Sequence, residues 1–570
     1  MEDLLQLHSM QRTIPNEVPR ALRGNPTPLQ EEEWRVRLQK HPDSRLKDYV
    51  LRGIREGFRV GYDYRKHRCR SVKDNLRSAL EHPDIVCKYI AEECAEGRLL
   101  GPFSPDSLPS VQVSRFGVIP KSTPGKWRLI LDLSSPEGQS VNDGIDPELC
   151  SLSYVSVDDA AQAVAKLGCG ALLAKVDIKS AYRMVPVHPE DRMLLGMMWE
   201  GALYVDATLP FGLRSAPKIF NTLADVLEWI LKQEGVDWVY HYLDDFLVVG
   251  APNSDQCMRQ LQTLLSVFDN LNIPVAMEKL EGPARILTFL GIELDMQALT
   301  LRLPAGKLTE LKCLIISWTH RKACTKRDLQ SLVGKLQHAC KVVRPGRSFL
   351  RRMFELLKGV LRKQHFIRLN KSFHSDLRWW QLFLDSWNGV AMIGSREWSP
   401  AFHLYSDASG SFGCGAWWDQ SWLQLAWPQD LQDWGIAVKE LFPIVVAAMV
   451  WGKRWAGHSI QVHCDNQAVV GVVNSGYCKD PSMMQLIRCL FFILAHFEIS
   501  LRATHIPGHL NTGADAISRN NLPLFHSQVP QAPFAATPIP PALMDLLAHQ
   551  RPDWTSPHWS QLFKTCLLQV

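Results

Sequence analysis

The sequence has no C-x-x-C pair, no apolar run of membrane-spanning length and no recognisable signal peptide. Its 14 cysteines are scattered from Cys69 to Cys566, which indicates neither a zinc site nor a redox motif. The N-terminus carries acidic residues where a signal peptide needs basic ones. These absences exclude the secreted and membrane-spanning classes and predict a reduced cytoplasmic or nuclear protein with no membrane partner.

The bulk properties of the chain are those of a globular, multidomain protein. With 570 residues, 46% of them hydrophobic, the chain can bury several cores, and its length suggests about three or four domains. The formal net charge of +5 is a mild basic excess. It is compatible with a nucleic-acid partner but does not require one.

Changes in composition along the chain predict five segments. Short β-rich runs such as WRLILDL and YLDDFLVV alternate with helical stretches, first in residues 81–300 and again in residues 396–520. This alternation favours an α/β and α+β multidomain fold. The expected segments are a basic, mostly helical leader, a first catalytic module, a helical connection, a second catalytic module and a proline-rich linker with a short helical end: residues 1–80, 81–300, 301–395, 396–520 and 521–570.

Three acidic residues mark the first candidate site. Asp244 and Asp245 interrupt the apolar segment VYHYLDDFLVVG, and Asp177 ends the apolar strand LLAKVD. Taken singly, these residues are explained as a polar turn and a helix cap. If they meet, each like-charge pair about 4 Å apart costs roughly 4 kcal/mol, which a bound cation relieves. Hard oxygen ligands of this kind suit Mg²⁺.

Two further segments carry groups suited to a nucleotide. Lys121 and Arg128 lie on a predicted hairpin with a Pro-Gly turn and could meet a triphosphate, although solvated hairpin charges would look the same. Gly212, in LPFGLRSAPKIF, permits a close approach of the backbone. By itself this second segment is only a strand, a turn and a helix.

In this order, the motifs closely resemble the fingers and palm of reverse transcriptases, over roughly Ser110 to Asp295. The resemblance implies a right-hand polymerase of fingers, palm and thumb. It also implies roles for individual residues: metal ligation by Asp177, Asp244 and Asp245, triphosphate binding by Lys121 and Arg128, exclusion of the ribose 2′-hydroxyl by Tyr182, packing beneath the sugar by Phe211, a late palm lysine at Lys279, and a primer grip at Phe289 to Gly291.

Four more acids occur in the second module. Asp407 lies in a strand, Glu440 begins an apolar helix, Asp465 ends a strand and Asp515 begins a later helix. The first three have ordinary explanations as turn or helix-end residues. Together with Asp515, on a β-β-β-α-β-α-β-α order, they resemble ribonuclease H over about His403 to Arg519.

The second resemblance implies an endonuclease that cuts the RNA strand of an RNA–DNA hybrid with two Mg²⁺ ions, for which Mn²⁺ could substitute. His509 follows Gly508 where some ribonucleases H carry a mobile histidine. Only five residues separate it from Asp515, fewer than that pattern has, so a surface loop histidine is an equal alternative. The implied partners of the whole chain are an RNA template, a DNA primer, the hybrid and dNTPs.

Two further expectations concern the type of element. The sequence has no D-T-G or D-S-G motif and no His-His-Cys-Cys module, while its leader, the ADAISR segment and its tail resemble DIRS-type retrotransposons. In these elements a tyrosine recombinase follows ribonuclease H. Only the start of a recombinase is expected here, so the chain should not recombine DNA. The alternative function is an inactivated or domesticated retroelement protein that binds nucleic acid without catalysis.

Overall fold

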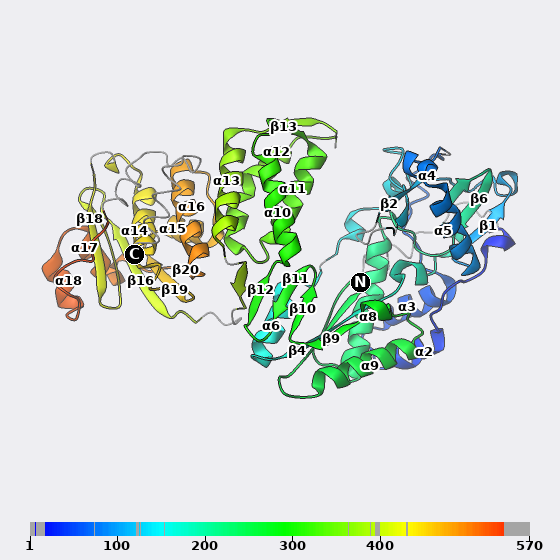
Figure 1. Ribbon diagram of the computed structural model, residues 1–570, viewed down its shortest axis with the longest axis horizontal. Coiled ribbons are helices and arrows are strands. Elements are labelled where there is room, and N and C mark those ends of the chain that lie inside the picture. Colours follow the sequence, from blue (N-terminus) through cyan, green and yellow to red (C-terminus); the bar gives the residue numbers. More distant parts are fainter. Residues whose placement is uncertain are drawn as a thin grey trace. The chain divides into compact units, whose positions relative to one another are not determined.

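The chain divides into two compact units, the first ending at Leu290 and the second beginning at Gly291. The computed structural model (Figure 1) describes Gln6 and residues 18–540, apart from residues 73, 121–124, 126, 153, 363, 388, 394–398, 429 and 430. None of the described helices combines the length and the hydrophobicity that a membrane crossing requires.

Helices and short sheets alternate throughout the first unit. Its helices are α2 Glu31–Leu38, α3 Ser44–Glu56, α4 Arg77–Glu81, α5 Pro83–Ala95, α6 Val157–Leu167, α7 Pro189–Arg192, α8 Ala216–Gln233 and α9 Gln256–Asn270, with short 3₁₀ turns that include η5 Ala181–Met184 and η6 Met277–Lys279. Its strands are β1 Leu99–Phe103, β2 Phe116–Pro120, β3 Trp127–Leu131, β4 Leu172–Asp177, β5 Gly196–Trp199, β6 Ala202–Asp206, β7 Val239–Tyr242, β8 Asp245–Gly250, β9 Glu281–Ala284 and β10 Ile286–Phe289.

A four-stranded sheet in the order β7-β8-β4-β9 is the centre of this unit. Both neighbours of β4 run antiparallel to it, and β7 and β8 form a hairpin. Strand β8 is buried from Phe246 to Gly250 because α8 and α9 cover the sheet. Two smaller sheets, β1-β6-β5 and the β2-β3 hairpin, complete the unit.

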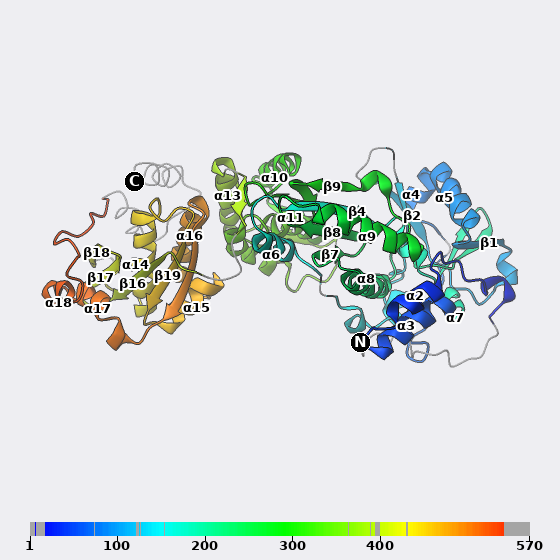
Figure 2. The ribbon, with the colours of Figure 1, turned by 90° about the horizontal axis from the view of Figure 1, so that it is seen from below.

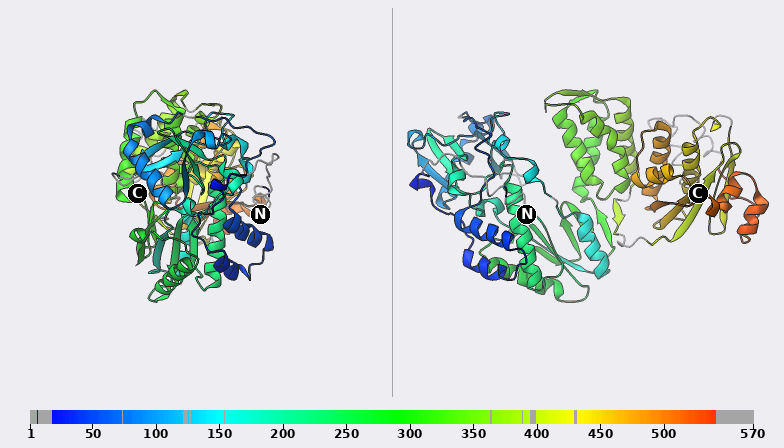
Figure 3. Two further views of the ribbon diagram at one scale, coloured as in Figure 1. Left: turned by 90° about the vertical axis from the view of Figure 1, so that its right-hand side faces the viewer. Right: turned by 180° about the vertical axis from the view of Figure 1, so that it is seen from behind.

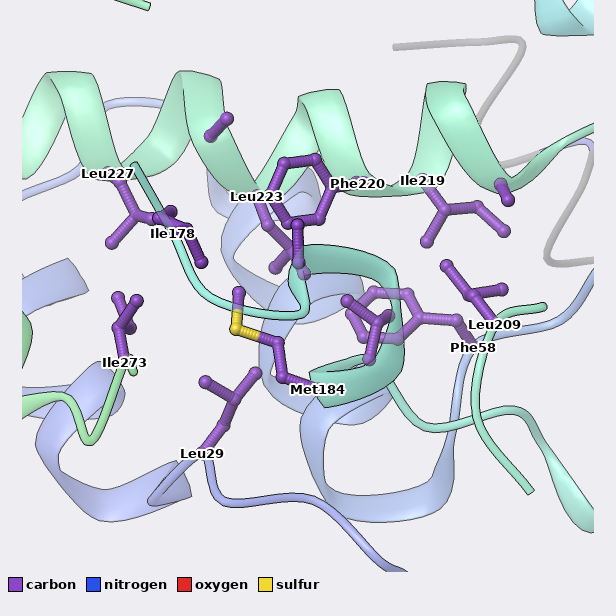
Figure 4. Close-up of a cluster of buried hydrophobic side chains, with 14 of the residues drawn as sticks. Leu29, Phe58, Ile178, Met184, Leu209, Ile219, Phe220, Leu223, Leu227 and Ile273 are labelled. Atoms are coloured by element: carbon purple, nitrogen blue, oxygen red, sulfur yellow. The ribbon is translucent and has the colours of Figure 1, made fainter. Parts of the chain in front are cut away.

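The segment expected to be a leader shares the core of this sheet. Trp34 of α2 and Tyr49 of α3 are buried in the same hydrophobic cluster as the residues of β4 and α8. Figure 2 shows α2 and α3 beside α8. In the close-up of Figure 4, side chains from the N-terminal segment, from the loop after β4 and from α8 meet, namely Leu29, Phe58, Ile178, Met184, Ile219, Phe220, Leu223 and Leu227.

The second unit joins a helical stretch to a five-stranded module. Its helices are α10 Ala305–Trp318, α11 Lys326–Ala339, α12 Arg351–Leu357, α13 Lys371–Ser386, α14 Ile436–Trp451, α15 Gln467–Ser475, α16 Pro481–His496, α17 Thr512–Ser518 and α18 Leu522–Gln528, with 3₁₀ turns at η7 Arg344–Phe349 and η9 Gly508–Leu510. Its strands are β11 Ile292–Asp295, β12 Thr300–Arg302, β13 Ala323–Thr325, β14 Phe366–Arg368, β15 Val390–Met392, β16 Phe402–Ala408, β17 Gly413–Trp418, β18 Ser421–Ala426, β19 Ser459–Cys464 and β20 Ser500–His505.

The five-stranded sheet has the order β18-β17-β16-β19-β20. The pairs β16-β17 and β17-β18 are antiparallel, whereas β19 runs parallel to both β16 and β20. Successive side chains of a strand point to opposite faces, so Cys414 faces α14 while Gly415 lies against Ile517 of α17. The expected element order is present, with one helix, α16, added before β20.

The helical stretch contacts this module where η7 packs on α16, and in Figure 3 its green helices lie beside the orange helix of the module. A buried carboxylate belongs to this contact. Asp376 of α13 is fully buried and accepts hydrogen bonds from Arg352 of α12, with Nε 2.7 Å from Oδ2. Arg488 of α16 approaches the same carboxylate at 3.5 Å. Trp379 of α13 extends the contact, with 6.2 Å between its ring centroid and that of Phe492 in α16.

The described part of the expected linker is packed rather than free. Phe525 of α18 is fully buried against Trp422, in a cluster that also holds Val529 and Ala532. The Trp422 indole donates a hydrogen bond to the Pro533 carbonyl at 2.7 Å. The apolar residues between the prolines therefore close one edge of the module. The recombinase-like end predicted for the tail lies outside the described residues from position 541 onward.

Candidate active sites

The three acids of the first module lie on adjacent strands of one sheet. Asp177 at the end of β4 and Asp245 at the start of β8 are direct cross-strand partners. Asp244 is in the turn between β7 and β8, where its carbonyl accepts a hydrogen bond from the Ile178 amide at 2.9 Å. Leu243 adopts a left-handed conformation, φ 54°, and makes this turn tight. Strand register thus brings together residues that are far apart in sequence.

A lysine offsets part of the negative charge. Lys279 in η6 donates a hydrogen bond from Nζ to Asp177 Oδ1 at 2.8 Å. Burial, with the neighbouring Asp244 and Asp177 charges, raises the pKa of Asp245 to about 6. Burial and the Asp177 charge also raise the pKa of Asp244, while Lys279 and Arg128 oppose that rise. The site therefore favours a cation that allows Asp244 and Asp245 to ionise.

Three side chains expected to contact a nucleotide, together with Gly212, lie near these acids. Tyr182 in η5 packs on Phe211 with 5.4 Å between ring centroids, and the Arg128 guanidinium lies 4.7 Å from the centroid of the same Phe211 ring. Gly212 has φ +108°, and a Cβ there would lie 2.2 Å from the Leu131 carbonyl oxygen, so this position requires glycine. Lys121 lies outside the described residues.

The second module gathers its acids from four separate elements. Asp407 is in β16, Glu440 in the first turns of α14, Asp465 directly after β19 and Asp515 in α17. A ligand atom from each of Glu440, Cys464 and Asp465 lies within 4.8 Å of the other two. Ser518 of α17 donates a hydrogen bond from Oγ to Asp407 Oδ2 at 2.5 Å.

Burial and neighbouring charges raise the pKa values of two acids in this cluster. Burial, followed by the charges of Asp407 and Asp465, raises the pKa of Glu440 to about 9. Burial and the Asp465 and Asp515 charges raise the pKa of Asp407 to about 6 despite the Ser518 hydrogen bond. Arg519 pairs with the more exposed Asp515 at 2.6 Å. The donor set fits a hard divalent cation, because such an ion takes oxygen ligands and can neutralise several carboxylates at once.

His509 lies beside this cluster but outside its hydrogen-bond network. It is exposed in η9, directly after Gly508, where a Cβ would lie 3.4 Å from Asp465 Oδ2. The loop that carries His509 therefore borders the acids. A catalytic role for this histidine stays a prediction.

Three residues in or near the two sites were not predicted from the sequence. Ser518 follows Asp515 by one helical turn, and that spacing was its only signal. Cys464 directly precedes Asp465 and is fully buried. His241 of β7 is buried and lies between two carboxylates of α8, 2.7 Å from Glu228 and 3.3 Å from Asp225. Its partners were not predictable from its sequence neighbours.

One family model matches the chain. It is described as reverse transcriptase (RNA-dependent DNA polymerase) and matches residues 119–294, which include Arg128, Asp177, Tyr182, Asp244 and Asp245. The match confirms the predicted fold class, a right-hand polymerase followed by a further domain.

Curated relatives come from retroelements and retroviruses. The chain is 22% identical over 452 residues to the retrovirus-related Pol polyprotein from transposon gypsy of Drosophila melanogaster, covering 77% of this chain and 40% of that protein. It is 25% identical over 236 residues to the Pro-Pol polyprotein of Simian foamy virus type 1, covering 41% of this chain and 18% of that protein. The chain therefore spans less than half the length of these relatives.

Among solved structures, the chain is similar to foamy viral protease-reverse transcriptases. One, the dRH form in complex with double-stranded DNA, is 15% identical with a TM-score of 0.46, covering 87% of this chain and 84% of that chain. Another, in complex with an RNA/DNA hybrid, is 15% identical with a TM-score of 0.44, covering 83% of this chain and 62% of that chain.

Proposed function

We propose that this chain, which contains a reverse transcriptase domain over residues 119–294, is an RNA-directed DNA polymerase with ribonuclease H activity. The polymerase copies retroelement RNA into DNA, and the second module hydrolyses the RNA strand of the hybrid. The observation that carries this proposal is the presence of two separate carboxylate clusters, each with raised pKa values.

In the polymerase site, the chain's own residues bind and orient the reactants. Arg128 and Lys121 bind the triphosphate of a dNTP, and Phe211 packs beneath its sugar while Tyr182 excludes a 2′-hydroxyl. Asp177, Asp244 and Asp245 would hold two Mg²⁺ ions, or Mn²⁺ in their place. Such ions would supply the positive charge that activates the primer 3′-hydroxyl and stabilises the departing pyrophosphate. Lys279 keeps Asp177 oriented.

In the ribonuclease H site, Asp407, Glu440, Asp465 and Asp515 would hold the metal ions. Ser518 fixes the Asp407 carboxylate and Arg519 fixes that of Asp515. The 2′-hydroxyl of the hybrid's RNA strand distinguishes the strand that is cut. The DIRS-type affiliation rests on the leader, the ADAISR segment and the tail, and stays a prediction.

The test is a pair of assays on one preparation of the purified chain. We expect extension of a DNA primer on an RNA template with dNTPs and Mg²⁺, and release of labelled RNA from an RNA–DNA hybrid. Binding of primer–template and hybrid without either reaction would overturn the proposal in favour of the inactivated or domesticated alternative. Extension without RNA release would restrict the function to polymerisation.

A further inference from the structure

The second carboxylate cluster contains a sulfur atom. Cys464 is the last residue of β19, and its Sγ lies with oxygens of Glu440 and Asp465 inside a group whose atoms are all within 4.8 Å of one another. Within the parts of the chain that the structure describes, this is the one group of three or more His, Cys, Asp or Glu ligand atoms at that spacing. A thiol next to carboxylates changes which cations the site favours.

An independent observation points to a ligand at the same place. The Glu440 side chain is 5% exposed, and its Oε2 is buried without a hydrogen-bond partner among the described residues. A buried carboxylate oxygen with no partner is costly and calls for a donor or a cation. Because Glu440 belongs to the three-atom group, a cation there would satisfy this oxygen and contact Cys464.

We propose that Glu440, Cys464 and Asp465 form a binding site for a thiophilic divalent cation of the Zn²⁺ or Cd²⁺ class, which competes with Mg²⁺ for this module. Three protein ligands and one open position are a usual arrangement for Zn²⁺. Thiolate selects such ions over Mg²⁺, whose ligands are oxygens. The competition with Mg²⁺ rests on the proposed ribonuclease H function, whereas the binding itself does not.

Binding replaces the thiol proton with the metal. The Cys464 S–H bond and any O–H bond of the Glu440 carboxyl break as sulfur and oxygen bind the metal, and these protons leave to solvent without any change of oxidation state. Two carboxylate bonds complete the protein ligands. The same two acids would otherwise contribute to Mg²⁺ binding, so the two cations exclude each other.

The chain provides a matched control in Cys414. Like Cys464, Cys414 is fully buried in the same sheet, and burial together with the Glu440 charge raises its pKa. It does not belong to the three-atom group. Removal of either thiol therefore changes the core similarly, but only the removal of Cys464 takes away a ligand.

The experiment is a Cd²⁺ titration of the full chain, followed by the ultraviolet charge-transfer absorption of cadmium–thiolate bonds. We expect Cys464→Ala to lack one thiolate component of that absorption. Its affinity for Cd²⁺ should fall at least about tenfold. Cys414→Ala should match the wild type. Wild-type absorption and affinity in Cys464→Ala would overturn the proposal.

Two further measurements keep the outcomes separate. The first is thermal unfolding of each variant, including Cys464→Ser, without metal. It shows whether a loss of the cadmium–thiolate absorption reflects the loss of a ligand or the loss of the fold. The second is hybrid cleavage by the wild type in Mg²⁺, with and without Zn²⁺, which tests the competition.

The proposed function and this inference can fail separately. Cadmium binding through Cys464 without any hybrid cleavage would contradict the proposed function and leave the cation site standing. Hybrid cleavage in Mg²⁺ without cadmium binding through Cys464 would contradict the cation site and leave the proposed function standing.

Discussion

The carboxylates of the first unit are held by strand pairing, whereas those of the second are held by packing. Asp177 and Asp245 face each other across β4 and β8, and the tight turn before β8 places Asp244 beside them. In the second unit, Glu440 and Asp515 belong to helices that must dock on the sheet before the acids meet.

The two clusters also differ in how their charge is compensated. Lys279 already neutralises one acid of the first cluster. In the second, the buried Glu440 oxygen has no partner within the described chain, and burial with neighbouring charge raises its pKa to about 9. We infer that the first site is largely formed without its cations, while the second depends on them more strongly.

The largest expected effect is that of Asp244→Asn on polymerisation. The substitution keeps the shape of the turn but removes a metal-binding charge, so we expect extension rates to fall on the order of a hundred- to a thousandfold. Primer–template binding, measured by anisotropy, should change little because phosphate contacts supply it. Hybrid cleavage by the same preparation is the control. If Asp244→Asn also lost hybrid cleavage, the two clusters would not act independently.

Asp465→Asn is the reciprocal test. It should stop the release of labelled RNA from a hybrid by a similar factor, because one ligand of the second cluster is lost. Primer extension should stay at the wild-type rate. Cleavage at the wild-type rate would remove Asp465 from the site, and joint loss of both activities would indicate misfolding.

Tyr182→Val tests the nucleotide side of the first cluster. Loss of the ring that packs on Phe211 opens space at the expected position of a 2′-hydroxyl. We expect the preference for dNTPs over rNTPs to fall by about tenfold or more in single-nucleotide extension. Phe220, which also contacts Tyr182, provides a control through Phe220→Leu. An unchanged preference in Tyr182→Val would place the gate elsewhere.

His241 should produce the smallest effect, on stability rather than on catalysis. Burial lowers its pKa, but hydrogen bonds to Asp225 and Glu228 outweigh burial and raise it to about 9. Because the folded-state pKa is raised, this contribution is complete below about pH 6.5 and is lost as pH rises through about 9. We expect roughly 3 kcal/mol over that window in urea unfolding of the wild type, and no such window in His241→Gln. Equal pH dependence in both proteins would contradict the assignment.

Local sequence was enough to place the acids but not their partners. Asp177 and Asp465 end apolar strands, and such ends are visible in the sequence as a change from apolar to polar residues. The hydrogen bond between Lys279 and Asp177 spans 102 positions and depends on the return of the chain after α9. The sequence alone predicts no distance of that kind, so only the resemblance pointed to Lys279.

Packing also explains why the two segments that we expected to be a leader and a linker are parts of the folded units. Charged residues of both signs are frequent in α2 and α3, whereas apolar residues such as Trp34 are buried in the core of the first unit. Likewise, prolines between residues 521 and 540 suggested an extended linker, but Phe525 and Val529 provide enough apolar surface to hold the segment on the sheet. In both segments a few buried side chains outweighed the average composition.

The buried Asp376 carboxylate limits how this protein can exchange parts with its relatives. Arg352 comes from the helical stretch and Arg488 from the five-stranded module, yet both face one fully buried acid. A recombination event that replaced the module alone would leave that acid with one cation fewer, in a place where an under-compensated charge is strongly destabilising. Successful chimaeras should therefore transfer α12, α13 and α16 together, so that the natural crossover point lies before residue 344 rather than between the helices and the module.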